Sequence, residues 1–413
     1  MEKYVLVGFN KAALEFLADR FPAGSVVVVE EPDVIAARRV DELIADNPCV
    51  GDLVGAPVQD EHDPAAVVAA VPRPEGVCAV VPANEYGVVA AAALAQAWGL
   101  PGATVGAATV LRDKVRLREC ALAAGIPQPA FREVADDAGV KEFLATQAGE
   151  GVLKPANRQG SLGVRLLSPG DDVAEAWRRC VSEDAPNRRP SRELPTRYLV
   201  EQRLRGAEVS VEALVCNGSM VFVNVTAKDV LPGTRPVEMG HTVPAALPQD
   251  VVVELHELMR RLVTATGFAT GVLHAEWMLA AGESPKLIEC AGRMPGDSID
   301  HLIDLAYGGS LLLDLITALS GRSPARPAQP LMASAIRFLE CGTGEVVAIG
   351  DTGSVSAMDG VLEVEVSVGV GDEVGAVNHS WDRPGWIVAT GPDSATAAAT
   401  ALAAASSVRI ELR

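Results

Sequence analysis

The sequence predicts a mixed α/β and α+β protein, and three observations support this prediction. The chain has 413 residues, which at roughly 150 residues per domain corresponds to two or three domains. Within about the first 105 residues, short apolar runs alternate with helical stretches, a pattern typical of a parallel sheet. Beyond them, predicted strands follow one another directly, as in antiparallel hairpins.

The N-terminal part is predicted to hold three buried strands and two helices. The Ala-rich stretch 87–98 is interrupted by Gln96 and ends at Trp98-Gly99, so we interpret it as a core helix and not as a membrane span. The sequence contains no Gly-x-Gly-x-x-Gly, the fingerprint of a dinucleotide site. The predicted strands are 4–7, 26–29 and 77–81, and the other predicted helix is 11–20.

A break at Leu100-Pro101-Gly102 separates this part from the middle of the chain. A charged helix, 107–124, is predicted after it, and the proline-containing segment 183–197 is predicted to be a surface loop. The predicted strands of the middle part are 198–202, 208–216, 220–226, 271–279 and 286–290, of which the last two form a hairpin, and its further helices are 250–266 and 298–319.

Prolines at 324, 327 and 330 mark a second boundary, which is followed by a small α+β unit. Its predicted strands are 333–339, 361–368, 386–390 and 408–412, and its helix is 395–405. The predicted domains are therefore a parallel-sheet domain at 1–106, a central domain at 107–325 with a mobile lobe at about 127–200, and a C-terminal subdomain at 326–413.

Charge and cysteine content narrow the choice of partner and compartment. Acidic residues outnumber basic ones by 54 to 35, giving a formal net charge of −19. Nucleic acids and anionic membranes attract the opposite charge, so we expect neither as a partner. The seven cysteines are scattered and include no Cys-x-x-Cys, which argues against a disulfide framework or a zinc site. With no signal-peptide run, we expect reduced thiols in a cytoplasmic protein.

The first candidate for chemistry is a lysine followed by a glycine-containing loop. Lys154 ends an apolar stretch, and Gly160 and Gly163 flank Ser161 and Leu162. Glycines let backbone N–H groups approach phosphate oxygens, and lysine adds a point charge. An ordinary glycine-containing hairpin explains the pattern equally well, and the spacing differs from that of a P-loop. Because the chain has only seven lysines, one at this place carries added weight.

Two further glutamates flank a turn. Glu201 and Glu208 lie on either side of Gly206. A strand edge can pair with an adenine, and a carboxylate can accept hydrogen bonds from both ribose hydroxyls. On these residues alone, a solvated charged strand is the better explanation.

A third group lies on the predicted hairpin. Glu276 and Glu289 occupy consecutive apolar strands, where they are placed to face one another. Two facing carboxylates repel unless a cation lies between them, and Mg²⁺ fills that role at phosphate sites. Arg293 follows and is suited to stabilise charge on a transferring phosphoryl group. The alternative is a polar strand face with a surface arginine.

In their order along the chain, these residues resemble the ATP-grasp superfamily, in which a nucleotide is held between two α+β lobes. The resemblance spans about residues 1–413 in layout and is sharpest from Asp113 to Asp297. It implies an ATP-grasp fold with an N-terminal Rossmann-like pre-ATP-grasp domain and a small C-terminal unit. It also implies ATP with one or two Mg²⁺ ions, or Mn²⁺ in their place.

The resemblance implies a role for each matching residue. Lys114 and Lys154 correspond to the phosphate-contacting lysines, Ser161 to the mobile glycine loop, Glu201 and Leu204 to the adenine hinge, and Glu208 to the ribose ligand. Glu276 and Glu289 correspond to the Mg²⁺ ligands, and Arg293 to the arginine that steadies an acyl phosphate. The catalytic candidates are therefore Arg293, Lys154 and Ser161. One position departs from the family's Glu-x-Asn-x-Arg. Ala291 stands in place of the Asn and offers a metal no side-chain oxygen.

Several segments are similar to the carboxylate–amine ligase branch, including the L-amino-acid ligases. They include Asn84-Glu85, Arg112-Asp113-Lys114 and Glu238-Met239-Gly240-His241. The resemblance implies that a small carboxylic acid is phosphorylated by ATP and then attacked by an amine, giving an amide, ADP and phosphate. It implies amino acids as substrates and a homodimer. A biotin-carboxylase-like carboxylase and a non-catalytic nucleotide-binding protein are the alternatives.

Four residues are weaker candidates for substrate contacts. His274 shares a strand face with Glu276, and His241 follows a glycine in a predicted loop. Asp297 and Arg337 are candidates for binding the charged ends of a substrate. Packing roles for the two histidines have equal weight.

Overall fold

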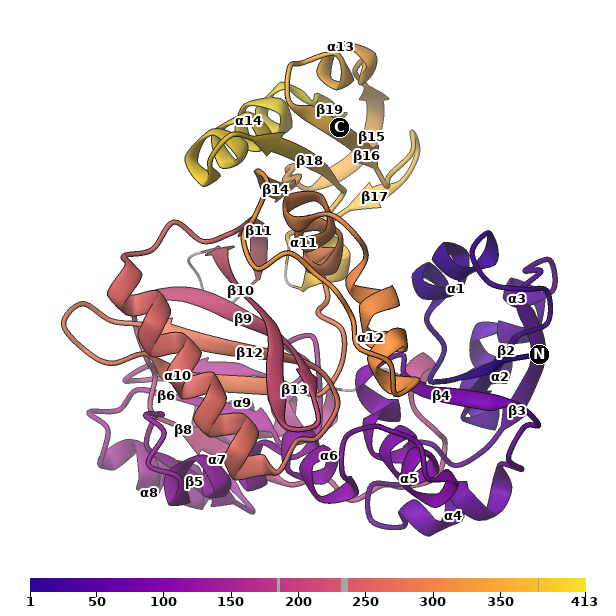
Figure 1. The fold of residues 1–413 in the computed structure, drawn as a ribbon. Helices are drawn as coiled ribbons and strands as arrows, with labels where there is room; N and C mark the ends of the chain where they lie inside the picture. The colour runs from indigo at the N-terminus through magenta and orange to yellow at the C-terminus, as the bar shows by residue number, and fades with distance from the viewer. Residues whose placement is uncertain (184–185, 232–236, 378) are drawn as a thin grey trace.

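The computed structural model describes residues 1–183, 186–231, 237–377 and 379–413 and is shown in Figure 1. The N-terminal part is a four-stranded parallel sheet in the order β3-β2-β1-β4. Its strands are β1 (Lys3–Val7), β2 (Val26–Glu30), β3 (Val50–Gly55) and β4 (Val77–Pro82). All five residues of β2 are buried, as expected for a strand covered on both faces.

Helices cover both faces of this sheet, and strand alternation determines which side chains they meet. Tyr4 and Leu6 pack with α1, whereas Val5 and Val7 pack with α4 and α5. The helical elements are α1 (Lys11–Ala18), α2 (Pro32–Arg38), α3 (Val40–Ile44), α4 (Pro64–Ala70), η1 (Glu85–Gly87) and α5 (Val88–Trp98). Sequence analysis missed β3, an edge strand whose residues are half-buried or exposed and which therefore lacks an apolar run.

The predicted continuous helix 107–124 is wrong. The structure has two helices there, α6 (Val105–Arg112) and α7 (Lys114–Ala123), separated by Asp113 in an extended conformation. The Asp113 side chain accepts hydrogen bonds from the backbone N–H groups of Val115 and Arg116. Aspartate is among the residues preferred at helix N-caps, because its carboxylate satisfies otherwise unpaired N–H groups. The break places Lys114 at the first position of a new helix.

The predicted mobile lobe contains a second four-stranded sheet, in the order β5-β8-β6-β7 with antiparallel pairs. Its strands are β5 (Phe131–Val134), β6 (Gly151–Pro155), β7 (Arg165–Leu167) and β8 (Tyr198–Glu201), and it is packed by α8 (Asp137–Ala145) and α9 (Val173–Ser182). In the segment 183–197, residues 184 and 185 lie outside the described residues. The rest includes η2 (Pro186–Arg188) and contacts the N-terminal part, where Arg192 forms two 2.7 Å hydrogen bonds with buried Glu31.

The largest sheet has eight antiparallel strands in the order β13-β12-β9-β10-β11-β14-β18-β16. They are β9 (Ala207–Cys216), β10 (Ser219–Val230), β11 (Glu238–Val243), β12 (Gly271–Leu279), β13 (Lys286–Ala291), β14 (Ala333–Phe338), β16 (Val361–Val366) and β18 (Gly385–Gly391). Because β11 pairs with β14, the sheet continues across the predicted boundary at 325. We therefore propose residues 326–413 as a subdomain that shares this sheet.

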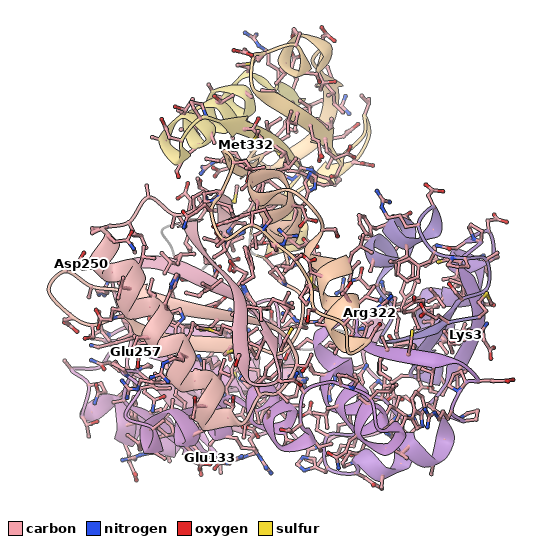
Figure 2. All side chains as sticks on the ribbon, in the orientation of Figure 1. Lys3, Glu133, Asp250, Glu257, Arg322 and Met332 are labelled. Atoms are coloured by element: carbon pink, nitrogen blue, oxygen red, sulfur yellow. The ribbon has the colours of Figure 1, made fainter. Side chains whose placement is uncertain are left out.

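Helices on opposite faces complete the central part. The helix α10 (Gln249–Thr266) packs on one face, and its exposed Asp250 and Glu257 lie on its outer side (Figure 2). The predicted helix 298–319 is instead two helices, α11 (Ile299–Tyr307) and α12 (Leu311–Leu319), bent by 96°. Gly308 and Gly309, both with positive φ, form the break.

The C-terminal subdomain adds a three-stranded sheet in the order β17-β15-β19. Its remaining elements are α13 (Gly353–Ser356), η3 (Ser380–Asp382) and α14 (Ser394–Ser407), with strands β15 (Gly344–Ile349), β17 (Glu373–Val374) and β19 (Ile410–Leu412). Sequence analysis missed β15 and β17. Among the described residues, no single helix is long and apolar enough to span a membrane, although α11 and α12 together pass a test of length and composition.

Candidate active site

A cavity of about 520 Å³ is lined by residues of the lobe sheet and of the eight-stranded sheet. This volume is within the range typical of small-molecule sites. The eight residues predicted to meet nucleotide or metal all line it: Lys114, Lys154, Ser161, Glu201, Leu204, Glu208, Glu276 and Glu289. Residues up to 175 positions apart are thus brought together (289 − 114), while their individual roles stay predictions.

Strand alternation decides which side chains of the large sheet reach the cavity. On β9 and β12, Val211 and Ala275 belong to the core packed under α10. Glu208 and Glu276 have the opposite parity, so they point to the other face of the sheet, away from α10. The register of β9 and β12 therefore places the carboxylates on one surface.

Lys154 lies on the lobe side of the cavity and is anchored by a buried carboxylate. Its Nζ is 2.7 Å from Oε2 of Glu201, and Nε of Arg118 donates to Oε1 of the same residue at 2.7 Å. Burial alone would raise the pKa of Glu201, but the charges of Arg118 and Lys154 outweigh it and lower that pKa to about 2. The carboxylate of Glu201 is thus paired with two cations, and a role of this residue at the adenine stays a prediction.

Lys114 connects the lobe to the large sheet. Its Nζ donates to the backbone oxygen of Arg158 at 2.7 Å and lies 2.9 Å from Oε1 of Glu289. Because Asp113 is the N-cap of α7, Lys114 is the first residue of that helix, and this fixes where its side chain begins. The two predicted phosphate lysines therefore each contact a carboxylate.

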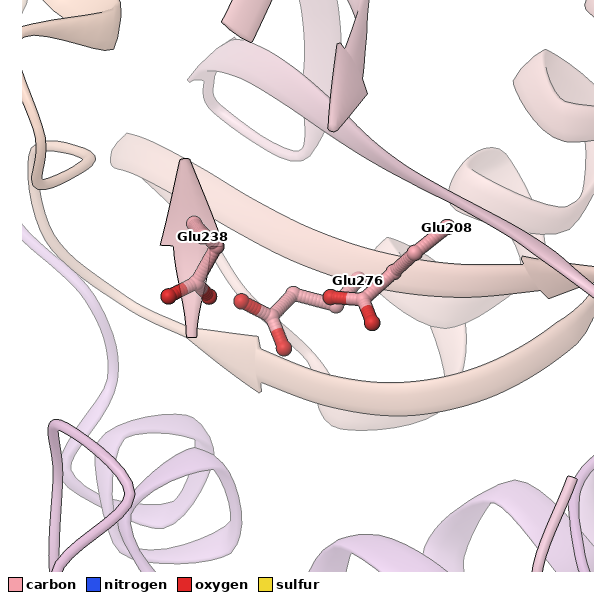
Figure 3. Close-up of side chains that lie close together, drawn as sticks. All are labelled: Glu208, Glu238 and Glu276. Carbon is pink, nitrogen blue, oxygen red and sulfur yellow. The ribbon is translucent and has the colours of Figure 1, made fainter. Parts of the chain in front are cut away.

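The carboxylates of Glu208, Glu238 and Glu276, all cavity residues, lie close together (Figure 3), and one buried lysine contacts all three. Nζ of Lys228 lies 2.5 Å from Glu208, 2.8 Å from Glu276 and 3.1 Å from Glu238. Burial would lower the pKa of Lys228, but the three carboxylates raise it well above its usual value. Lys228 is therefore a fixed positive charge inside an acidic cluster.

The acidic cluster also has the donor set that a divalent cation requires. One carboxylate oxygen from each of Glu208, Glu238 and Glu276 lies within 4.8 Å of the others. Carboxylate oxygens are the ligands that Mg²⁺ and Mn²⁺ prefer. These three residues therefore offer oxygens that suit the predicted metal, and a cation bound there would share them with the ammonium group of Lys228.

The second predicted metal ligand lies apart from this cluster. Glu289 is in register with Glu276 across the β12–β13 pair, as predicted, but its carboxylate contacts Lys114. Ala291, two residues further on, is 3% exposed and adds no oxygen. Of the predicted pair, only Glu276 belongs to the three-carboxylate set.

Lys228, Glu238 and Arg118 are cavity residues that sequence analysis did not identify. Lys228 is one of only seven lysines, and that rarity was a usable signal. Glu238 lies in a segment that supported the family resemblance, but its role depends on the pairing of β10 with β11, where it lies opposite Val230. That register is a tertiary property.

His274 bridges the acidic cluster and a buried carboxylate beneath it. Its Nδ1 is 2.9 Å from Oε1 of Glu212, and its Nε2 is 3.6 Å from Oε1 of Glu276. Burial would lower the pKa of His274, but its hydrogen bonds to the two glutamates raise it to about 9. The imidazole is therefore held between two carboxylates and is not part of the cavity lining among the described residues.

Arg293, the predicted catalytic arginine, is held by the N-terminal part. Its Nε donates to Oε2 of Glu85 at 2.7 Å, and Arg112 lies on the other side of that buried carboxylate. Burial would raise the pKa of Glu85, but the charges of Arg293 and Arg112 lower it. Arg293 does not line the 520 Å³ cavity as the described residues define it, so its role stays a prediction.

The other substrate candidates also lie outside that lining. Asp297 forms two hydrogen bonds, of 2.7 and 2.9 Å, with Arg383 of the C-terminal subdomain, and Nε2 of His241 is 3.5 Å from the same carboxylate. Arg337 pairs with Asp229. Two of the candidates, His241 and Asp297, therefore adjoin each other, and Arg337 has a separate partner.

Comparisons with known proteins agree with this geometry. A family model for the ATP-grasp domain matches residues 150–300, and one for L-amino acid ligase C-terminal domain 2 matches residues 337–413. The crystal structure of an L-amino acid ligase from Bacillus licheniformis superimposes with a TM-score of 0.77 at 19% identity, over 100% of this chain and 99% of that one.

Sequence relatives cover less of the chain. An uncharacterized protein, y4rH, of Sinorhizobium fredii is 25% identical over 301 residues, which are 73% of this chain and 61% of the relative. Alanine–anticapsin ligase of Bacillus subtilis is 24% identical over 260 residues, 58% of this chain and 54% of the relative. The chain therefore spans less than two thirds of these curated relatives. The chain thus has an ATP-grasp fold, contains segments that match the ATP-grasp domain and the L-amino acid ligase C-terminal domain 2, and resembles the L-amino acid ligases.

Proposed function

We propose that this protein is an ATP-dependent carboxylate–amine ligase that forms an amide, in a dipeptide or pseudo-peptide, and releases ADP and phosphate. The observation that supports this most directly is the convergence of two lysines and three carboxylates on one nucleotide-sized cavity. The domain match at residues 337–413 favours this branch over a biotin-carboxylase-like enzyme. Small amino acids are the proposed acid and amine.

In the proposed first step, a carboxylate oxygen of the acid attacks the γ-phosphorus of ATP. The bond from that phosphorus to the bridging oxygen breaks, and ADP leaves with the bonding electrons. Lys114 and Lys154 bind phosphate oxygens, exchanging their present partners Glu289 and Glu201 for a more highly charged ligand. A divalent cation bound at the acidic cluster would neutralise charge on the phosphates.

In the second step, the amine nitrogen attacks the acyl carbon and loses a proton. The bond from carbon to the phosphate oxygen breaks, phosphate departs, and the amide remains. Arg293, oriented by Glu85, is proposed to steady the acyl phosphate. Positioning and charge stabilisation supply the rate enhancement, so no nucleophilic side chain is required.

The test is ATP turnover with Mg²⁺ and pooled amino acids, amines and small carboxylic acids, with ADP, AMP and phosphate measured separately. ADP and phosphate that form only when both an acid and an amine are present would support the proposal. Lys154→Met should abolish this turnover, whereas Lys141→Met, at an exposed ion pair with Asp137, should retain it. AMP and pyrophosphate would contradict the acyl-phosphate route.

The non-catalytic alternative has a specific observation in its favour, the missing side-chain oxygen at Ala291. Equilibrium binding of ATP without turnover of any acid and amine pair would support that alternative. A bicarbonate-dependent release of ADP would support the carboxylase.

A further inference from the structure

Glu212 is a fully buried carboxylate in the middle of β9, and four donors converge on it. Ser210 Oγ at 2.6 Å and His274 Nδ1 at 2.9 Å contact Oε1. Asn224 Nδ2 at 2.9 Å and Thr226 Oγ1 at 2.7 Å contact Oε2. Each oxygen thus has two partners, and these come from β9 itself and from the strands on either side, β10 and β12.

The cost of this arrangement requires an explanation. Burying an ionised carboxylate costs several kcal/mol even after relaxation, and apolar side chains of similar volume often replace buried ion pairs without loss of stability. Leu214, two residues along β9 on the same face of the sheet as Glu212, is a fully buried apolar residue, so this face of the strand does not need a charge in order to pack. A role beyond stability is therefore indicated.

The network reaches the acidic cluster through His274. With Nδ1 fixed on Glu212, the imidazole presents Nε2 to Oε1 of Glu276 at 3.6 Å. Lys228 contacts that same oxygen at 2.8 Å. The described residues thus hold Glu276 through Oε1 and leave Oε2 without a hydrogen bond.

We propose that Glu212 is a positioning residue for Glu276. By fixing His274, it restricts one oxygen of Glu276 and directs the other toward a divalent cation. The inference rests on the proposed function, since it assumes that the acidic cluster binds the cation that accompanies ATP. Groups that orient metal ligands typically change metal affinity by about 10- to 100-fold when they are removed.

The test measures cation binding without turnover. Mn²⁺ is titrated into the full-length protein with a non-hydrolysable ATP analogue present, and free Mn²⁺ is followed by electron paramagnetic resonance. Glu212→Gln keeps the shape of the side chain but removes its charge. His274→Asn keeps a donor to Glu212 and removes the edge that faces Glu276. Ser334→Ala is the control, since Ser334 is buried in the same sheet on β14 and bonds only Leu302 among the described residues.

We expect Glu212→Gln and His274→Asn to weaken Mn²⁺ binding about 10- to 100-fold, and Ser334→Ala to bind as the wild type does. A merely structural role of Glu212 would lower the thermal stability of the two network variants while leaving their Mn²⁺ affinities equal to that of Ser334→Ala. If Glu212→Gln does not fold, His274→Asn decides the question. Wild-type affinity in both network variants would overturn the inference alone, whereas a wild-type protein that binds no Mn²⁺ with the analogue would overturn the proposed function first.

Discussion

Replacing Glu201 by Gln should destabilise the protein, by an amount that depends on pH. The Glu201 carboxylate is 3% exposed and lies 2.7 Å from both Arg118 and Lys154. Its pKa falls from 4.5 to about 2 in the folded protein. At 1.36 kcal/mol per pKa unit, that shift corresponds to about 3 kcal/mol, close to the ~3–5 kcal/mol typical of breaking a buried ion pair.

The direction of the pH dependence follows from whether the folded or the unfolded protein binds the Glu201 proton more tightly. Because the pKa is lowered on folding, the contribution is fully present above the unfolded-state pKa of 4.5 and is lost as pH falls through 2. At pH 3 it should be about half its value at pH 7. Urea denaturation of the wild type and of Glu201→Gln at pH 7 and pH 4, with tryptophan fluorescence as the signal, should show a difference that shrinks in acid.

The control for this experiment is Glu142→Gln. Glu142 forms an exposed ion pair with Arg132, and its side chain is 75% exposed. Exposed pairs contribute about 0–1 kcal/mol, so this variant should unfold almost as the wild type does. Equal stability of Glu201→Gln and the wild type at pH 7, or a difference that grows in acid, would refute the reasoning.

Three further predictions concern the helix cap, the glycine loop and the acidic cluster. Asp113→Ala removes the N-cap of α7 and should lower the free energy of unfolding, measured by denaturation, by about 1 kcal/mol. It should also raise the KM for ATP, because the cap fixes the position of Lys114 at the start of the helix. An unchanged KM would show that the cap does not affect the site. Gly163→Ala should lower the melting temperature more than Gly170→Ala does. Both glycines have positive φ, but an added Cβ at Gly163 would lie 3.0 Å from the Cys180 carbonyl oxygen, whereas one at Gly170 would face open space. Equal melting temperatures would contradict this. Lys228→Met leaves three carboxylates without the ammonium group that they share. The melting temperature of this variant should therefore fall in EDTA and should rise with Mg²⁺ more than that of the wild type. A melting temperature that does not respond to Mg²⁺ would argue against a divalent cation at this cluster.

The fold was largely predictable wherever local pattern and tertiary environment agree. The buried runs of β1, β2 and β4 are apolar on both faces, and their sequences show it. The predicted helices were wrong where one or two residues end a helix inside a stretch whose overall pattern is helical. Asp113 divides one predicted helix, and Gly308-Gly309 divides another. The edge strand β3 carries Asp52 and two glycines, so its strand character comes from pairing with β2.

The candidate site was predictable for residues that lie in ordered motifs. Lys154, with its glycine loop, and Glu276, with its strand, could be identified because their neighbours in sequence carry the signal. Lys228 offered only its rarity as a signal and Glu212 offered none, because the partners that define their roles come from other strands. Which carboxylates lie beside that of Glu276 also depends on strand order: those of Glu208 and Glu238 do, whereas that of Glu289 contacts Lys114.

The continuity of the eight-stranded sheet across residue 325 has a consequence for how the chain is made. Until β14 is synthesised, the outer edge of β11 has no strand to pair with. The 95 residues from the end of β11 to the end of β14 (338 − 243) take roughly 5–19 s to synthesise at ~5–20 residues per second. During that time an unpaired strand edge lies beside the forming cavity, and such edges attract strands of other chains. The yield of folded protein should therefore depend on chaperones and on the rate of translation between β11 and β14.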